Sequence, residues 1–157
     1  MSEETMPGPD AVVSLREITE ETLRPILRLS DTLQPPQSRM VATNAVSIAQ
    51  AHFSKYAWFR AIYADETPVG FIMLYDSPEE KTYFLWRLMV GAPYQGMGFG
   101  RQAVKLLIDY VKSRPDATEL LVSCEQGDGS PEGFYRRLGF ERNGKMYDDE
   151  VGLSLPL

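Results

Sequence analysis

The sequence has few of the residues on which metal centres and nucleophilic hydrolases depend. Its 157 residues include one cysteine, Cys124, and one histidine, His52. A disulfide needs a pair of cysteines and a zinc site needs several Cys or His ligands, so we expect neither. A Ser/His/Asp or Cys/His hydrolase would depend entirely on His52, which lies in a helical pattern without a nucleophile motif. Cys124 lies in an apolar strand pattern, which is typical of a buried, inert thiol.

Long apolar runs and an excess of basic residues are also missing. No apolar stretch approaches the roughly 18 residues needed to span a bilayer, and the acidic, Pro- and Gly-containing residues 1–10 do not resemble a secretory signal. The 22 acidic residues outnumber the 16 basic ones, and the net charge of −6 disfavours binding to nucleic-acid phosphates. We expect a cytoplasmic protein that binds neither nucleic acid nor membranes. Its acidity suits a cationic substrate.

The length and composition fit one globular domain. Hydrophobic residues make up 43% and charged residues 24% of the chain, and 157 residues fall in the usual range of a single domain. No repeat, low-complexity block or linker divides the sequence. We therefore expect a flexible tail at residues 1–10 and one domain at residues 11–157.

Alternating and helical hydrophobic patterns follow one another along the chain. Strand signals occur at 11–18, 57–64, 69–75, 82–90 and 120–125, helix signals at 22–30, 38–53, 100–112 and 131–138, and a hairpin signal within 141–157. The turns between the three middle strands favour antiparallel pairing. The strand, helix and strand between residues 82 and 125 form a parallel βαβ unit. The pattern predicts a mixed α/β fold with a mostly antiparallel sheet of six to seven strands, about four helices and one parallel crossover.

A glycine-rich turn connects the strand and the helix of this βαβ unit. It reads Gln95-Gly96-Met97-Gly98-Phe99-Gly100-Arg101. Glycines at a helix start expose unpaired N–H groups at the positive end of the helix dipole, and a diphosphate is the usual ligand of such a site. The dinucleotide fingerprint does not fit because its acidic partner is missing, and no Gly-Lys-Ser/Thr follows as in a P-loop. A tight connection without a ligand is the structural alternative.

Two motifs resemble those of the GNAT superfamily of N-acetyltransferases. Gln95, Gly98 and Gly100 match Q-x-x-G-x-G, the turn with which that superfamily binds the pyrophosphate of acetyl-CoA. Tyr135 to Phe140 is similar to its Y-x-x-x-G-F segment, at the spacing that the superfamily uses. The order of the expected elements also matches from Val12 to Leu155. The resemblance implies a GNAT-like fold with acetyl-CoA as cosubstrate.

Three stretches resemble the bacterial spermine/spermidine (diamine) N-acetyltransferases within that superfamily. They are Val41-Ala42-Thr43-Asn44 with Ser47-Ile48-Ala49-Gln50-Ala51, Tyr83 through Val90, and Gly139-Phe140 through Gly144 to Asp149-Glu150-Val151. The likeness implies acetyl transfer to a primary amine, a small polyamine such as spermidine or spermine. A peptide N-terminus, a protein lysine, an aminoglycoside and a non-catalytic acyl-CoA sensor stay open. Many similar proteins pair as dimers, which leaves a homodimer open.

The resemblance also assigns roles to individual residues. The strand before the turn is expected to bulge and splay from its parallel neighbour, with a main-chain N–H near Met89 as oxyanion donor. Tyr135 is the expected general acid for the leaving thiolate. Asp128 stands where many relatives have Asn, and Ser130 is the substitute for that contact. The expected cofactor-binding residues are Leu88, Met89, Val90, Gln95, Gly96, Met97, Gly98, Phe99, Gly100, Arg101, Asp128, Ser130 and Tyr135.

The general base is the least constrained of these roles. Many relatives place a Glu on the strand that corresponds to residues 82–90, and this chain has none there. An alkyl ammonium, with a pKa of about 10.4, must lose a proton before it attacks. Glu125 and Glu150 are the candidate bases. Glu150, with Asp148 or Asp149, would also anchor a distal ammonium, and a solvated turn is the alternative for this acidic group. The expected catalytic residues are thus Tyr135, Met89 and Glu150.

Overall fold

The computed structural model describes residues 6–157. The expected N-terminal tail therefore lies partly outside the described residues, and within its described part Pro7 is buried. The domain boundary at residue 11 stays a prediction. Among residues 6–157, no helix combines the length and the apolar character that crossing a membrane requires.

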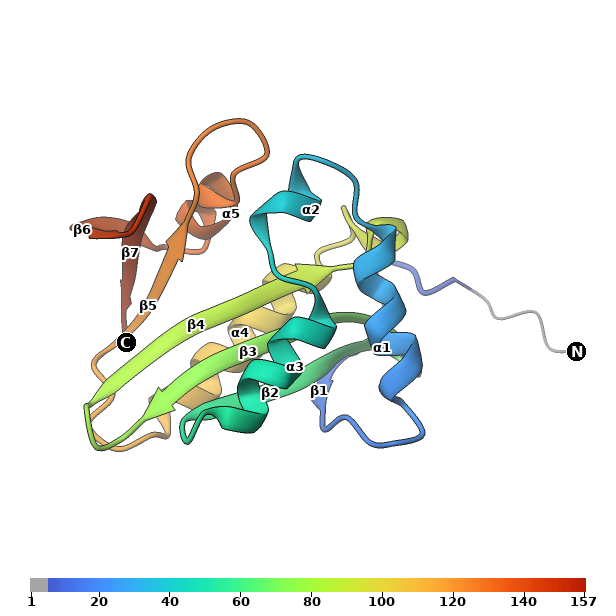
Figure 1. The fold of residues 1–157 in the computed structure, drawn as a ribbon, viewed down its shortest axis with the longest axis horizontal. Coiled ribbons are helices and arrows are strands. Elements are labelled where there is room, and N and C mark those ends of the chain that lie inside the picture. The colour runs from blue at the N-terminus through green and yellow to red at the C-terminus, as the bar shows by residue number, and fades with distance from the viewer. Residues whose placement is uncertain (1–5) are drawn as a thin grey trace, which may run out of the picture.

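One seven-stranded sheet organises the described chain (Figure 1). Its strands lie in the order β1-β2-β3-β4-β5-β7-β6. They are β1 (Val13–Arg16), β2 (Ala57–Ala64), β3 (Thr67–Ser77), β4 (Thr82–Val90), β5 (Glu119–Cys124), β6 (Glu141–Tyr147) and β7 (Glu150–Pro156). All neighbouring pairs are antiparallel except β4 and β5, which are parallel. The predicted mixed sheet with one parallel crossover is confirmed.

Helices cover both faces of the sheet (Figure 1). On one face, here named the α4 face, α4 (Phe99–Lys112) packs into the main core through residues such as Leu107. On the opposite face, here named the α3 face, α1 (Leu23–Leu29) and α3 (Asn44–Phe53) cover a second core around Phe71. The remaining helices are α2 (Gln37–Met40), α5 (Glu132–Arg137) and the 3-10 turns Ser30–Thr32 and Ala92–Tyr94. Each fully buried side chain of leucine size contributes about 1.5–3 kcal/mol, so both cores hold the sheet in place.

The prediction of a single helix at residues 38–53 is wrong, because this segment forms two helices, α2 and α3. Val41 is extended between them, with φ −136° and ψ 136°. Thr43 is the N-cap of α3, and its hydroxyl accepts a hydrogen bond from the Val46 N–H at 3.2 Å. Such a cap takes extended backbone angles and ends any helix that precedes it. The apolar pattern continued across the break because Val41 and Ile48 both pack on the same core.

Candidate active site

A groove opens where β4 and β5 separate. The parallel ladder pairs only Phe84 with Leu121 and Leu85 with Val122, although β4 continues to Val90. The β3–β4 register shifts beside Met73, which leaves Trp86 as the extra residue of a bulge. A bulge bends its strand and interrupts the ladder. The bulge and the splay predicted before the glycine turn are therefore confirmed.

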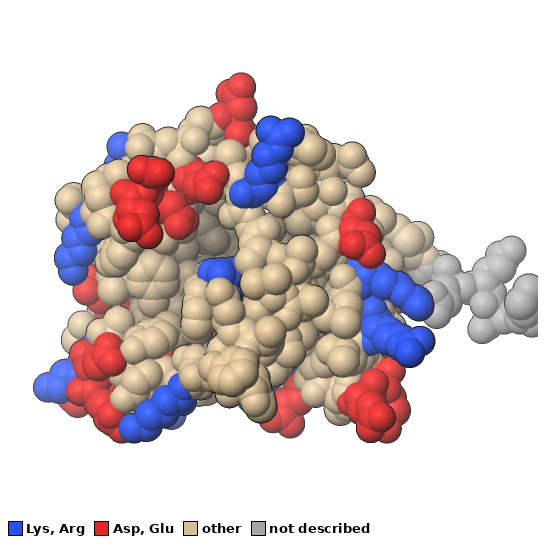
Figure 2. Space-filling model, in the orientation of Figure 1, with Lys and Arg blue, Asp and Glu red and all other residues tan. Residues whose placement is uncertain are grey.

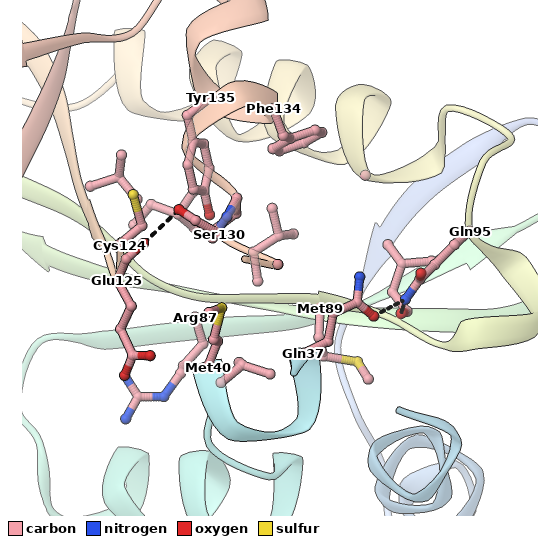
Figure 3. A pocket seen from close by; sticks show the side chains of 18 of the residues that line it. Gln37, Met40, Arg87, Met89, Gln95, Cys124, Glu125, Ser130, Phe134 and Tyr135 are labelled. Atoms are coloured by element: carbon pink, nitrogen blue, oxygen red, sulfur yellow. Dashed lines mark hydrogen bonds between the residues drawn. The ribbon is translucent and has the colours of Figure 1, made fainter. Parts of the chain in front are cut away.

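The groove has a volume of about 1130 Å³. Figure 3 shows Tyr135 and Phe134 of α5 on one side of it, across from Met40 and Gln37 of α2. The sequence-predicted residues that line it are Leu88, Met89, Val90, Gln95, Gly96, Gly98, Phe99, Gly100, Arg101, Glu125, Ser130, Tyr135 and Glu150. Met97, Asp128, Asp148 and Asp149 are not among the lining residues. Met97 packs against the main core instead, and Asp128 is exposed.

The register of β4 decides which of its amides face the groove. The Gly91 N–H donates to the Val69 carbonyl at 2.8 Å, and Met89 lies opposite Phe71 in the same ladder. Because alternate residues of an antiparallel strand direct their N–H and C=O groups to opposite sides, the Met89 amide faces β3. The amides of Leu88 and Val90 face the gap. The amide of Met89 itself is therefore not available as the oxyanion donor predicted near this residue, those of Leu88 and Val90 are, and the donor role stays a prediction.

The glycine turn presents a row of main-chain amides to the groove. The Gln95 N–H donates to the Ala92 carbonyl at 3.3 Å, and the next main-chain bond is from Gln102 to Gly98 at 3.1 Å. Within residues 6–157, no hydrogen-bond acceptor is found for the amides of Gly96, Met97 and Gly98. Those of Phe99, Gly100 and Arg101 lie in the first turn of α4, which has no intrahelical acceptors. The row is therefore available to an anion.

Two glycines of the turn, Gly96 and Gly98, border open space. Gly96 and Gly98 both have positive φ, 82° and 83°, and a Cβ built on either would meet nothing within 4 Å. Glycine adopts a positive φ at a lower cost than any other residue. The turn is therefore a concave set of N–H donors at the start of a 14-residue helix, which fits a diphosphate.

The side chain of Gln95 has a different place from its neighbours. Its amide nitrogen donates to the Val90 carbonyl at 2.9 Å and to Gln37 Oε1 at 3.0 Å (Figure 3). These bonds tie the turn to the end of β4 and to α2. Gln95 is thus placed to position the turn, and its direct contact with a cofactor stays a prediction.

Arginine side chains add positive charge at the groove. Arg101 follows the turn, as expected, and Arg137 at the end of α5 also lines the groove. Sequence reasoning assigned no role to Arg137, because its place at the groove depends on how α5 packs. Guanidinium groups bind phosphate oxygens strongly, so both side chains suit the phosphates of CoA.

Tyr135 lies deep at one wall of the groove. Its side chain is 5% exposed, and its ring contacts those of Phe134 and Phe140 with centroids 5.2 and 5.6 Å apart. Burial raises the pKa of the Tyr135 hydroxyl above its ordinary value, and the nearby Cys124 and Glu150 raise it further. The phenol is therefore protonated at any physiological pH and can act as a proton donor but not as a base.

Two carboxylates line the groove where β5 ends and β7 begins, those of Glu125 and Glu150. Glu150 begins β7, and the Ser123 hydroxyl donates to its Oε1 at 3.4 Å. Burial raises the pKa of Glu150, and the charges of Glu125 and Asp148 raise it further, while Ser123 and Arg87 lower it. Figure 2 shows acidic side chains beside a hollow on this face of the molecule. Glu150 is therefore a carboxylate poised to take a proton.

The loop between β5 and α5 is held by Ser130. Its hydroxyl donates to the Glu125 carbonyl at 2.5 Å (Figure 3) and accepts from the Glu132 N–H at 3.2 Å. These bonds fix the start of α5 and with it the position of Tyr135. No group of three or more His, Cys, Asp or Glu side chains in the part of the chain that the structure describes is arranged to hold a metal ion.

The amino-acid sequence of the chain matches a known protein family. The model of the acetyltransferase (GNAT) family matches residues 20–140. No curated protein sequence matches the chain significantly.

Solved structures with the same fold cover nearly the whole chain. The ribosomal-protein-S18-alanine N-acetyltransferase from Escherichia coli is 16% identical with a TM-score of 0.69, covering 92% of this chain and 94% of its own. The PaiA N-acetyltransferase from Thermoplasma acidophilum, solved in complex with coenzyme A, is 14% identical with a TM-score of 0.72, covering 93% and 99%. An acetyl transferase from Salmonella typhimurium, which modifies the N-terminal serine of 50S ribosomal subunit protein L7/L12, is 15% identical with a TM-score of 0.75, covering 95% and 97%. At these identities the likeness is one of fold, and the resemblance to spermine/spermidine acetyltransferases stays a prediction.

Proposed function

Because the chain belongs to the acetyltransferase (GNAT) family and is an acetyl-CoA-dependent acetyltransferase that acts on an amine, we propose that its acceptor is a small primary amine, with a polyamine such as spermidine as the first candidate. The carboxylates at the groove carry this proposal. Glu125 and Glu150 line it, and Asp148 is close enough to raise the pKa of Glu150. A carboxylate within a few ångströms both binds and orients an ammonium.

The two substrates reach the reaction from opposite faces of the sheet. The glycine turn and Tyr135 belong to the α4 face, where Phe99 and Tyr135 join the main core. Cys124 and Val151 also belong to that core, so alternation directs the neighbouring Ser123, Glu125 and Glu150 to the α3 face. Acetyl-CoA therefore occupies the gap from the α4 face, and the amine enters from the α3 face.

The residues of the groove supply the elements of acetyl transfer. A carboxylate of the groove, Glu125 or Glu150, takes a proton from the reacting ammonium, directly or through water, and the neutral nitrogen attacks the thioester carbonyl. A β4 amide, that of Leu88 or Val90, donates to the developing oxyanion. The carbon–sulfur bond then breaks, Tyr135 protonates the thiolate, and the proton that the amide nitrogen loses returns through water to Tyr135. Acetyl-CoA supplies the activated acetyl group, with its diphosphate on the amides of residues 96–101.

A panel of acceptors tests this proposal. Release of CoA from acetyl-CoA is followed with spermidine, cadaverine, a peptide with a free N-terminus, a lysine peptide with a blocked N-terminus and an aminoglycoside. We expect turnover with the small amines. Turnover with a peptide and none with the small amines contradicts the proposal and favours the second candidate, a protein N-terminus, which the Salmonella typhimurium structure is described as modifying.

Glu150→Gln tests the anchoring role. The substitution raises KM for the diamine cadaverine about tenfold and leaves KM for pentylamine within about twofold, because only the diamine presents a second ammonium. Steady-state kinetics with both amines give the two values. Asp149→Asn is the matched control, since it removes an adjacent carboxylate that does not line the groove. Equal increases for both amines would remove the anchoring role.

Glu150 also gives a stability prediction that is independent of turnover. Its pKa in the folded protein is raised above the value of 4.5 for an unperturbed Glu. A raised pKa means that the folded state holds the proton more tightly than the unfolded state, so the stabilising contribution is complete below the unfolded pKa and is lost as the pH rises through the folded pKa. We therefore expect Glu150→Gln to melt at a higher temperature than the wild type at pH 7 and at the same temperature near pH 4. A lower melting temperature at pH 7 contradicts the partial burial of an ionised carboxylate.

A further inference from the structure

The groove contains a cation that no ion pair neutralises. Arg87 of β4 lines it and is half-buried. Among residues 6–157, no carboxylate lies within ion-pair distance of the Arg87 guanidinium. A charge removed from water without a partner is costly, and here burial lowers the pKa of Arg87 while Glu150 only partly opposes this.

The existing contacts of Arg87 do not satisfy its guanidinium. One terminal nitrogen donates to the Trp86 carbonyl at 3.0 Å and the other to Gln50 Oε1 at 3.0 Å. Its Nε is buried without a hydrogen-bond partner among the described residues. A guanidinium has five N–H donors in a planar fork that matches a carboxylate. Donor capacity is therefore left for an oxyanion.

Arg87 lies on the acceptor side of the gap. Its contact with Gln50 places it towards α3, whereas the next residue, Leu88, packs towards the main core on the α4 face. Glu125 and Glu150 lie on the same α3 face, across the gap from β4. Figure 2 shows basic atoms inside the hollow that the acidic side chains border. The acceptor end of the groove thus has charges of both signs, one on each side.

We propose that Arg87 binds a carboxylate of the acceptor, so that the preferred substrate is an amine that also carries a carboxylate, such as an amino acid, rather than a plain polyamine. The inference rests on the proposed function: it keeps a small primary amine as the acceptor and replaces the polyamine with an amino acid as the first candidate. The ammonium faces Glu150 and the carboxylate faces Arg87. A plain polyamine also presents its distal ammonium to Glu150 but has no group that binds Arg87.

Lysine and cadaverine form a matched pair for this test, because they differ only in the carboxylate. We expect kcat/KM for lysine to exceed that for cadaverine by about tenfold or more in the wild type, as a hydrogen bond between charged groups allows. Arg87→Gln brings the ratio to within about threefold, mainly by raising KM for lysine. Arg87→Lys, which keeps the charge and loses the fork, gives an intermediate ratio.

Arg60→Gln is the control variant. Arg60 of β2 donates to the carbonyl of the preceding residue, Phe59, and lies over the Trp58 ring, much as Arg87 bonds to the Trp86 carbonyl and lies over the Trp86 ring. It does not line the groove. The control therefore removes the same charge from a similar strand position, and the lysine to cadaverine ratio stays at the wild-type value.

Equilibrium binding separates this inference from the proposed function. Lysine and cadaverine are titrated into wild-type, Arg87→Gln and Arg87→Lys proteins saturated with CoA. Tighter binding of lysine that disappears in Arg87→Gln supports the carboxylate site even if neither amine is acetylated, a result that would reject the proposed function. Preference of the wild type for cadaverine, or equal losses of both amines in Arg87→Gln, overturns the inference while acetylation of cadaverine leaves the proposed function in place. If Arg87→Gln does not fold, the wild-type and Arg87→Lys titrations decide.

Discussion

Replacement of Tyr135 by phenylalanine lowers kcat by about 100-fold to 1000-fold and leaves the affinity for acetyl-CoA within about threefold of the wild type. The hydroxyl is the group that protonates the departing thiolate, and phenylalanine keeps the ring in its contacts with Phe134 and Phe140. Burial raises the pKa of Tyr135, so the hydroxyl stays protonated over the pH range of an assay. The substitution therefore removes a proton donor that titration does not remove. Steady-state turnover and direct titration of acetyl-CoA give the two quantities.

Tyr83→Phe is the control for removal of a buried hydroxyl. Tyr83 is 1% exposed, and its hydroxyl donates to the Pro115 carbonyl, away from the groove. This variant is expected to lose stability and to keep its kcat. A Tyr135→Phe enzyme with wild-type kcat contradicts the role of Tyr135 as the acid. A wild-type protein that binds acetyl-CoA and acetylates none of the amines in the panel supports the alternative of a non-catalytic acyl-CoA sensor.

Gly98→Ala weakens the binding of acetyl-CoA by at least about tenfold. The new methyl group enters the space in front of the amide row, and the strain of a left-handed alanine displaces the amides themselves. A lost hydrogen bond to a charged group corresponds to roughly tenfold or more in affinity. Isothermal titration with acetyl-CoA measures the loss.

Gly144→Ala provides a closely matched comparison for this variant. Gly144 in β6 has φ 80°, and a Cβ there would also meet nothing within 4 Å, but it does not line the groove. Both substitutions cost about 1 kcal/mol of stability from the left-handed backbone. Only Gly98→Ala is expected to lose affinity. Equal affinities in the two variants would mean that the turn does not contact the diphosphate.

The local features of the site could be predicted from the sequence. The glycine turn, the strand before it and the helix after it are signalled by adjacent residues, and Tyr135 stands in a short motif. The cap at Thr43 was missed because the apolar pattern continues through Val41, which packs on the same core as Ile48. Local patterns therefore located the turn and Tyr135 but not the break between α2 and α3.

The features that depend on strand pairing could not be predicted in the same way. The direction of the Met89 amide is fixed by its register with Phe71, and a shift of one residue reverses it. The place of Glu150 beside Ser123 depends on pairing between β5 and β7. Arg87 had no signal as a ligand-binding residue, because its exposure to the groove arises from the splay of β4 and β5. Such long-range pairings decide the acceptor end of the groove.

The most direct test of the account follows the backbone amides of residues 95–101 by NMR during titration with CoA and, separately, with pantetheine, which lacks the diphosphate. If these amides bind the diphosphate, CoA shifts the amide resonances of Gly96 through Arg101 strongly and pantetheine does not, although both shift those of Leu88 or Val90. Binding of CoA that leaves the resonances of residues 96–101 unchanged would contradict this role of the amides.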